Sequence, residues 1–259
     1  MLERCGADTL DGLYADIPEG IRFKGDYDIP SSMSEQEIRL FFDQLAKQNR
    51  QLTCFAGAGV YDHYVPALIP QIAGRSEFLT SYTPYQAEIS QGTLHYIFEY
   101  QSMMAELTGM DISNASLYDG ATATAEAAMM ACAATKKCDT VLLSETVDPK
   151  VAEVVDTYAH FHGMRIVRIP ESDGTTDFVQ MGNLLDNGGV AGVIVQQPNR
   201  YGIVEDLQGV ADSCHAHKAL LIMNSIAADL AVLKTPGEWG ADIAVGEGQS
   251  LGIPMSWGG

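Results

Sequence analysis

The segment 118–125, Tyr-Asp-Gly-Ala-Thr-Ala-Thr-Ala, has the residue types of a helix start that could bind an anion. An apolar run at about 112–118 precedes it and predicts a strand that leads into the helix. The first backbone N–H groups of a helix have no intrahelical acceptor, and the helix dipole makes that end positive. Such a turn can bind phosphate. Asp119 could equally serve as a simple helix cap, so these residues alone leave both interpretations open.

The glycines of Ala56-Gly-Ala-Gly-Val-Tyr-Asp62 are spaced like the start of a dinucleotide-binding loop. Asp62 stands where the third glycine of that motif belongs, and the segment precedes the regular strand and helix region. NAD binding is therefore not expected here. A loop that lets the backbone approach a ligand or a partner closely stays open, because glycine has no Cβ.

Histidines occur in two pairs, His160 with His162 and His215 with His217. Residues two apart on a helix lie on different faces, so neither pair is expected to bind a metal ion. The sequence also lacks the G-x-S-x-G, H-E-x-x-H and G-x-x-x-x-G-K-[ST] motifs. Their absence removes the commonest hydrolase, metalloprotease and P-loop nucleotidase interpretations.

The composition indicates a globular chain of 259 residues, 46% hydrophobic and 19% charged. Its net charge of −19 repels phosphate backbones and anionic lipid headgroups, so neither nucleic acid nor a membrane is expected as a partner. No signal peptide or run of 18 apolar residues occurs, which predicts a soluble intracellular protein. The five cysteines form no C-x-x-C pair and are expected to be small buried apolar residues: Cys5, Cys54, Cys132, Cys138 and Cys214.

Residues 1–110 are expected to form an N-terminal helical and loop-rich segment. A Ser-x-x-Glu capping box that begins at Ser34 predicts an amphipathic helix over about 35–49. A second helix is predicted over about 92–108. It should end at Gly109, since glycine adopts the left-handed conformation of a helix C-terminus at least cost.

Residues 111–259 are expected to form an α/β domain with a mostly parallel sheet and helices on both faces. Asp148-Pro149 and Gly163 are typical of the two ends of one helix. Apolar runs without polar alternation predict strands covered on both faces. These runs alternate with stretches of helical period and lie at about 112–118, 139–143, 165–169, 190–196, 219–224 and 242–246.

Five blocks of sequence, in order, resemble one family. They are Gly57-Ala-Gly-Val-Tyr-Asp-His-Tyr-Val-Pro66, Arg75-Ser-Glu-Phe-Leu-Thr-Ser-Tyr-Thr-Pro-Tyr-Gln86, Glu88-Ile-Ser-Gln-Gly92, Asn114-Ala-Ser-Leu-Tyr-Asp-Gly-Ala-Thr-Ala123 and Gly246-Glu-Gly-Gln-Ser-Leu-Gly-Ile-Pro254. The blocks are similar to the P-protein of the glycine cleavage system, and within it to the separate N-terminal subunits known as glycine dehydrogenase (decarboxylating) subunit 1. The resemblance runs along the whole chain. It implies the large domain of a fold-type I transferase that depends on pyridoxal phosphate (PLP).

The resemblance also implies an activity and partners. In that family PLP takes up glycine, CO2 leaves, and the aminomethyl group passes to the lipoyl arm of the H-protein. The active subunit holds PLP through a lysine, and Gln249 stands at that position here; its amide cannot form the covalent link. Asn224 ends a predicted strand where such enzymes usually place an aspartate against the pyridine nitrogen. The chain is thus expected to have no catalytic residues of its own, to be inactive alone, and to pair with a PLP-bearing subunit 2.

Two sets of site residues follow from the resemblance. Side chains expected to line an active site shared with subunit 2 are Tyr82, Tyr85, Gln86, Glu88, Tyr61, His63 and Tyr64. The residues Asp119, Gly120, Ala121 and Thr122 are expected to be the relic of a phosphate cup, kept as a helix cap. The aromatic residues could instead only pack the subunit interface, because tyrosine is common at interfaces.

Two other functions stay open at the level of sequence. The chain could be a purely structural scaffold for subunit 2, or an autonomous PLP enzyme that uses another lysine, such as Lys234 or Lys218. The family's subunits continue beyond the point that matches Gly259, so the α/β domain is expected to be incomplete, without the small C-terminal domain. Separate subunits imply a prokaryotic cytoplasm.

Overall fold

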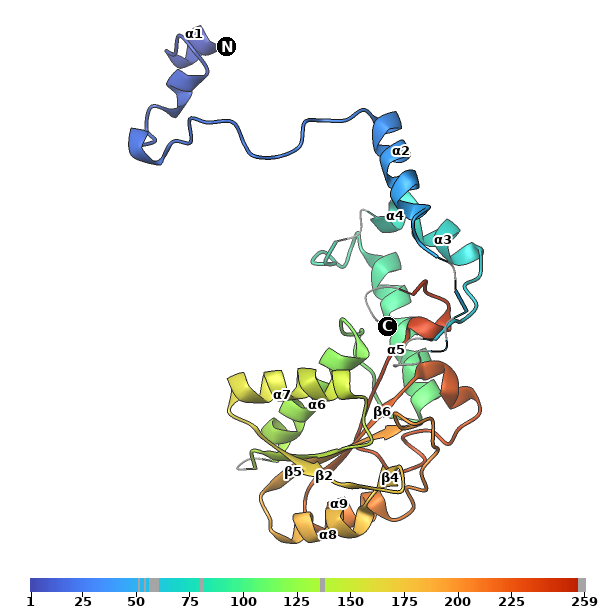
Figure 1. The fold of residues 1–259 in the computed structure, drawn as a ribbon. Coiled ribbons are helices and arrows are strands. Elements are labelled where there is room, and N and C mark those ends of the chain that lie inside the picture. The colour runs from blue at the N-terminus through green and yellow to red at the C-terminus, as the bar shows by residue number, and fades with distance from the viewer. Residues whose placement is uncertain (51, 54, 56–60, 80–81, 136–137, 256–259) are drawn as a thin grey trace. The chain divides into compact units, whose positions relative to one another are not determined.

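A computed structural model describes the chain except for residues 51, 54, 56–60, 80–81, 136–137 and 256–259 (Figure 1). It divides into two compact units, Met1–Cys54 and Phe55–Gly259. The change of sequence character near residue 110 lies inside the second unit, and a domain boundary there stays a prediction. Most of the glycine-rich loop and Cys54 lie outside the described residues.

The first unit contains short helical elements and one longer helix. The short elements are α1 (Leu2–Cys5), η1 (Asp11–Tyr14) and η2 (Glu19–Ile21), and the longer helix is α2 (Glu35–Ala46). The predicted capping box is confirmed: the side chain of Ser34 accepts from the N–H of Glu37, and the Glu37 carboxylate accepts from the N–H of Ser34 at 2.8 Å. The helix ends three residues earlier than predicted.

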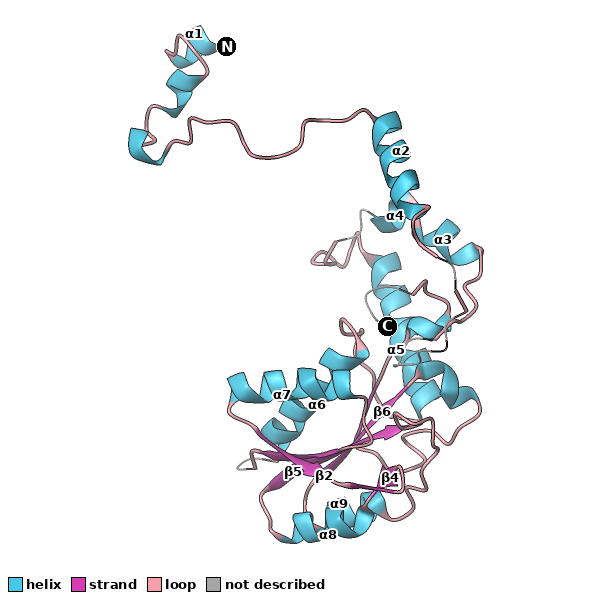
Figure 2. Ribbon diagram, viewed as in Figure 1, coloured by secondary structure: helices cyan, strands magenta, loops and turns pink. Residues whose placement is uncertain are grey.

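The second unit is built on a five-stranded parallel sheet (Figure 2). Its strands are β1 (Thr140–Ser144), β2 (Arg165–Ile169), β5 (Val190–Gln197), β6 (Leu220–Ser225) and β7 (Ile243–Val245). They lie in the order β2-β1-β5-β6-β7, and every neighbouring pair is parallel. This confirms the predicted sheet. Because the strands are parallel, their carboxyl ends meet along one edge, where α/β proteins commonly bind ligands.

Helices cover both faces of the sheet. On one face lie α6 (Gly120–Ala134) and α7 (Pro149–His162), and on the other lie α8 (Phe178–Asp186) and α9 (Val210–Ala216) (Figure 1). Each face has its own buried cluster: Leu142, Val193 and Met223 belong to one, and the alanines of α6 pack with Val141 and Ile222 in the other. Neighbouring strand residues thus point to opposite cores, which is why the strands are uniformly apolar.

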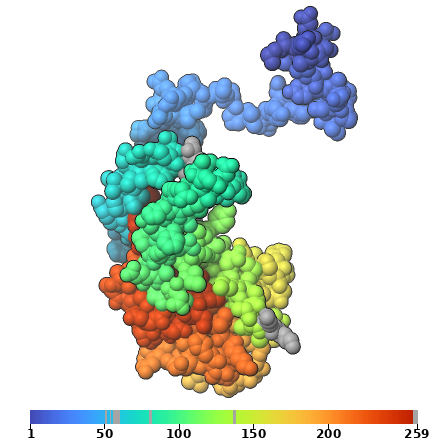
Figure 3. Space-filling model, turned by 180° about the vertical axis from the view of Figure 1, so that it is seen from behind, coloured from blue at the N-terminus to red at the C-terminus, as the bar shows by residue number. Residues whose placement is uncertain are grey.

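The N-terminal part of the second unit is helical, with α3 (Leu68–Ala73), α4 (Ser76–Leu79) and α5 (Gln91–Thr108). As predicted, α5 ends at Gly109, which has a φ of 69°. It packs beside η3 (Ala227–Ala231), as the green and red-orange surfaces in Figure 3 show. The predicted ends of α7 are also confirmed, since Asp148 caps its start and Gly163 its end.

The strand predicted over 112–118 is wrong. Ser116 has a φ of 97°, which an extended strand cannot accommodate. The side chain of Asn114 accepts from the N–H of Ser116 at 3.1 Å, and Gln101 of α5 donates to the carbonyl of Ser113 at 2.6 Å. Local turn bonds therefore replace a strand ladder in this segment.

Further features differ from the sequence expectations. A two-stranded antiparallel pair, β3 (Glu171–Ser172) and β4 (Thr175–Thr176), was not predicted. Among the described cysteines, Cys214 is buried as expected, whereas Cys5 is exposed because the short helix α1 buries none of its residues. No helix in the described part of the chain combines the length and the apolarity that crossing a lipid bilayer requires.

Candidate functional site

The start of α6 lies at the carboxyl edge of the sheet and is capped by its own residues. Asp119 Oδ1 accepts from the backbone N–H of Thr122 at 2.7 Å, and Thr122 Oγ1 accepts from the N–H of Asp119 at 3.3 Å. Capping in both directions satisfies two backbone donors at the helix start. Asp119 and Thr122 thus form a helix cap, although no strand precedes the turn. That these residues, with Gly120 and Ala121, are the relic of a phosphate cup stays a prediction.

A carboxylate from a distant part of the sequence accepts a hydrogen bond at the start of α6. Glu247, two residues after β7, accepts through Oε2 from the backbone N–H of Gly120 at 3.0 Å. Its other oxygen, Oε1, accepts from the N–H of Gln249 at 3.1 Å. The glutamate thus places a negative charge at the positive end of the helix and bridges two backbone donors.

Two glycines allow this close approach. A Cβ on Gly120 would lie 3.0 Å from the backbone nitrogen of Glu247 and from the carbonyl carbon of Gly246. A Cβ on Gly246 would overlap the backbone of Ser225 at the end of β6, at 2.7 Å from its carbonyl carbon. The end of β7 is therefore pressed between the end of β6 and the start of α6, and side chains at either glycine would push these segments apart.

A buried polar contact ties β6 to Thr124, the fifth residue of α6. Asn224 Nδ2 donates to Thr124 Oγ1 at 3.1 Å, and that hydroxyl donates to the carbonyl oxygen of Gly120 at 2.7 Å. Thr124 is 0% exposed and Asn224 is 7% exposed. Asn224 therefore faces α6. The family resemblance implies that PLP enzymes of this fold carry a pyridine-binding aspartate at this position, whereas the asparagine side chain has no charge.

Gln249 is a buried residue of η4 (Gln249–Leu251), directly after the Glu247 turn. The segment that contains His63 lies against the same region, since His63 Nε2 is 2.6 Å from the carbonyl oxygen of Ile253. A Cβ on Gly252 would also meet Pro66 and Ile69. The structure thus brings one member of the predicted shared site, His63, close to η4.

The other predicted members lie on the surface of the second unit. Tyr82 and Tyr85 are 81% and 82% exposed, and their ring centroids are 6.3 Å apart. Gln86 and Glu88 are exposed in the same loop before α5, and Tyr61 and Tyr64 are exposed beside His63. A shared active site lined by these residues stays a prediction.

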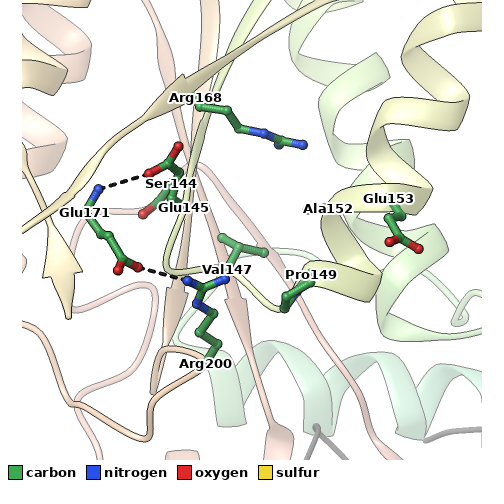
Figure 4. Close-up of a pocket in the computed structure, with 9 residues that line it drawn as sticks. All are labelled: Ser144, Glu145, Val147, Pro149, Ala152, Glu153, Arg168, Glu171 and Arg200. Carbon is green, nitrogen blue, oxygen red and sulfur yellow. Dashed lines mark hydrogen bonds and ion pairs between the residues drawn. The ribbon is translucent and has the colours of Figure 1, made fainter.

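A separate cavity of about 470 Å³ lies at the carboxyl ends of β1 and β2 (Figure 4). Charges of both signs line it, and one pair of them is in contact: Arg200 Nη2 lies 3.0 Å from Glu171 Oε2, and Tyr201 also donates to Glu171 at 2.8 Å. Arg168, also in the lining, pairs with Asp156 outside the cavity. The hydroxyl of Tyr201 and the Glu171 carboxylate raise the pKa of Arg200. The sheet order places β5 and β6 between β1 and β2, where this cavity lies, and β7, which the Glu247 turn follows.

The residues around the start of α6 do not fit a bound PLP. A phosphate at this helix start would compete with the Glu247 carboxylate for the N–H of Gly120. The sequence contains no lysine after Lys234, so the turn that follows β7 offers no amine for a covalent link. Asn224 cannot stabilise a protonated pyridine ring by charge.

Sequence reasoning did not assign Glu247 any role. Its flanking glycines, Gly246 and Gly248, directly after a strand, are the available indication that the backbone makes a close approach there. The acceptor role toward Gly120 depends on a contact across 127 positions of sequence, which no local pattern contains.

Comparisons with known proteins agree with the fold and with the resemblance. The family model of the glycine cleavage system P-protein matches residues 1–259. The "Probable glycine dehydrogenase (decarboxylating) subunit 1" of Desulforamulus reducens is 48% identical over 262 residues, and that of Moorella thermoacetica is 46% identical over 259 residues. Both matches cover 100% of this chain and 58% of the relative, so the chain spans less than two thirds of these relatives.

A solved structure described as glycine decarboxylase (P-protein) of the glycine cleavage system, in inhibitor-bound form, superposes with a TM-score of 0.90. It is 43% identical, and the match covers 100% of this chain and 58% of that one. A ureidoglycine-glyoxylate aminotransferase from Bacillus subtilis, 16% identical with a TM-score of 0.50 over 72% of this chain and 46% of its own, shares only the fold. The mostly parallel sheet is therefore that of the PLP-dependent fold-type I proteins. By its match along the whole length, the chain belongs to the glycine cleavage system P-protein family.

Proposed function

We propose that this chain is part of the cofactor-free subunit of a two-subunit glycine decarboxylase. The observation that carries the proposal is the match of the entire chain to relatives named subunit 1, at 46% to 48% identity. In the proposed complex, a subunit 2 holds PLP and this subunit helps to form the site where glycine is decarboxylated. The aminomethyl group then passes to the lipoyl arm of the H-protein. The bacterial relatives favour a bacterial cytoplasm as the compartment.

The geometry at the carboxyl edge supports a subunit without its own PLP. Glu247 occupies the helix start where the cofactor phosphate would bind, and Gln249 offers an amide instead of an amine. PLP would supply the electron sink for decarboxylation when bound to subunit 2. The role of this chain is then to close and orient the shared site, with Tyr82, Tyr85, Gln86 and Glu88 as the proposed contributors and Tyr61, His63 and Tyr64 beside them.

The exposed tyrosines favour such a role. Large side chains with a polar tip, such as Tyr82 and Tyr85, are typical of surfaces that a protein partner covers. An exposed carboxylate, Glu88, follows Tyr85 in the same loop and could accept a hydrogen bond from a bound ligand. A loop held by Pro84 can present these groups with little loss of conformational entropy.

The contacts of two lysines disfavour an autonomous PLP enzyme. Lys234 places its amine 3.8 Å from the ring centroid of Trp239, before β7 begins. Lys218 precedes β6 and therefore lies at the amino edge of the sheet. A strand of six residues is about 20 Å long, which separates Lys218 from the α6 start.

Reconstitution tests the proposal. The chain is mixed with the PLP-bearing subunit 2 of the same organism and with lipoylated H-protein, and the exchange of labelled bicarbonate into glycine is measured. We expect exchange to need both subunits and to fall about 10- to 100-fold in Tyr82→Phe or Glu88→Gln, since a hydrogen bond to a charged group is worth about 1.5–3 kcal/mol and each 1.4 kcal/mol or so is about tenfold in rate. Tyr158→Phe, on α7, is the matched control and should leave the exchange unchanged.

The outcomes separate the three functions. Normal exchange in both loop variants, with assembly intact by size-exclusion chromatography, would favour the structural scaffold. Borohydride reduction with PLP followed by intact mass measurement should label subunit 2 and leave this chain unlabelled. A stoichiometric adduct on a lysine of this chain would overturn the proposal and support an autonomous enzyme.

A further inference from the structure

We infer that Glu247 is a built-in anion that fills the start of α6 and excludes a phosphate group from that position. The absence of a lysine after β7 explains why PLP would not be linked covalently. The absence of this lysine does not explain why the helix start would not bind a phosphate. Phosphates bind such positions through backbone N–H groups and do not need a lysine there. Glu247 supplies the missing reason.

The first step of the argument is the position of the carboxylate. Oε2 of Glu247 lies 3.0 Å from the backbone nitrogen of Gly120, the first residue of α6, and so uses a donor that a bound phosphate would need. Oε1 lies 3.1 Å from the nitrogen of Gln249. Both oxygens thus accept from backbone N–H groups, one at the start of α6 and one two residues after Glu247.

The second step is the rigidity of the turn. The carbonyl oxygen of Glu247 accepts from the N–H of Ala227 at 3.1 Å, which fixes the backbone on its other side. Gly120 and Gly246 have no Cβ, so the start of α6, the turn after β7 and the end of β6 can lie in direct contact. These contacts hold the backbone of Glu247 in place, so a rotation of its side chain is the simplest movement that would free the N–H of Gly120.

The third step is charge. A phosphate at this position would meet a carboxylate at hydrogen-bond distance, and two anions that share one donor repel each other strongly where water is partly excluded. Glu247 is half-buried. The same negative charge that stabilises the positive end of α6 thus disfavours a second anion.

The inference predicts that removal of the carboxylate creates phosphate affinity. The experiment titrates inorganic phosphate against chloride at constant ionic strength, and follows both the melting temperature and the amide resonance of Gly120 in glycine-labelled protein. We expect Glu247→Ala to bind phosphate at least about tenfold more tightly than the unchanged chain, with a shift of the Gly120 resonance and a rise in melting temperature that follow the same binding curve.

Two further variants keep the result interpretable. Glu126→Gln removes one negative charge from an exposed position on the same helix, so it should bind phosphate as weakly as the unchanged chain. Glu247→Gln keeps the shape and an acceptor for Gly120 while removing the charge, and it should bind phosphate more tightly than Glu126→Gln. If Glu247→Ala fails to fold, the comparison of these two glutamine variants decides.

Equal phosphate affinity in the folded Glu247 variants and in Glu126→Gln overturns the inference, as does tight phosphate binding at Gly120 in the unchanged chain. The inference goes beyond the proposed function, because it concerns this chain alone. Its failure would leave exchange in the reconstituted complex untouched, and failure of reconstitution would leave the phosphate titration untouched.

Discussion

Asn224 and Thr124 join the end of β6 to the N-terminal part of α6 through a buried hydrogen bond of 3.1 Å, across 100 positions of sequence. The same threonine hydroxyl donates to the carbonyl of Gly120, so a chain of polar contacts runs from the sheet to the helix start. Buried polar groups in such chains are costly to leave unpaired. The contact therefore fixes how α6 sits on the sheet.

Replacement of either partner should destabilise the second unit. Asn224→Ala should lower the free energy of unfolding by about 1 kcal/mol, and Thr124→Val by about 1–3 kcal/mol, because valine removes the acceptor of the buried Asn224 amide. Urea unfolding measures both, and the double variant measures the coupling. Strictly additive losses would show that the two side chains do not interact.

Gly246→Ala should be strongly destabilising, by about 3 kcal/mol or more, because the new Cβ would overlap the backbone of Ser225 and no side-chain rotation can relieve it. The matched control is Gly182→Ala in α8, where a Cβ meets nothing within 4 Å. That change should stabilise the protein by about 0.5–1 kcal/mol, since alanine favours the helix. Thermal unfolding of the two variants side by side checks both signs, and equal effects would contradict the close approach.

His217 should make stability depend on pH. Its Nδ1 lies 2.8 Å from the carbonyl of Ser213 and its Nε2 lies 3.0 Å from Asp186, and these acceptors raise its pKa above the ordinary value of 6.5. Because the folded pKa exceeds the unfolded one, the contribution is fully present below the unfolded pKa and is lost as the pH rises through the folded pKa.

Urea unfolding of the unchanged chain and of His217→Gln at several pH values measures this contribution. The difference between them should shrink from acidic to alkaline pH, and a difference that grows with pH would contradict it. An NMR titration of Asp186→Asn is the control, in which the pKa of His217 should move back toward 6.5.

Cys214 should be the slowest of the described cysteines to react. It is 0% exposed, and burial raises the pKa of its thiol to about 12, with the charge of Asp242 adding to the shift. At pH 8 only about one thiol in ten thousand would be ionised, and the thiolate is the reactive form. Labelling with iodoacetamide followed by peptide mass mapping should modify the exposed Cys5 first and Cys214 only on unfolding. Comparable rates at both positions would show that Cys214 is accessible.

The sequence alone determined the elements whose causes are local. Asp148 and Gly163 delimit α7 as predicted, and the apolar runs at β5 and β6 are strands of a parallel sheet. Asp119 caps α6 through bonds to residues three positions away. Hydrophobic period and capping act within a few residues, so their effects are visible before the chain is folded. The family resemblance was equally a property of the sequence.

Only the tertiary structure decided what meets at the carboxyl edge of the sheet. The contact of Glu247 with Gly120 spans 127 positions, and that of His63 with Ile253 spans 190. The apolar run around Ser116 is a turn, because polar side chains and a neighbouring helix satisfy its backbone better than a strand ladder does. Such contacts depend on which segments the packed sheet and helices bring together, and neither local propensity nor residue spacing contains that information.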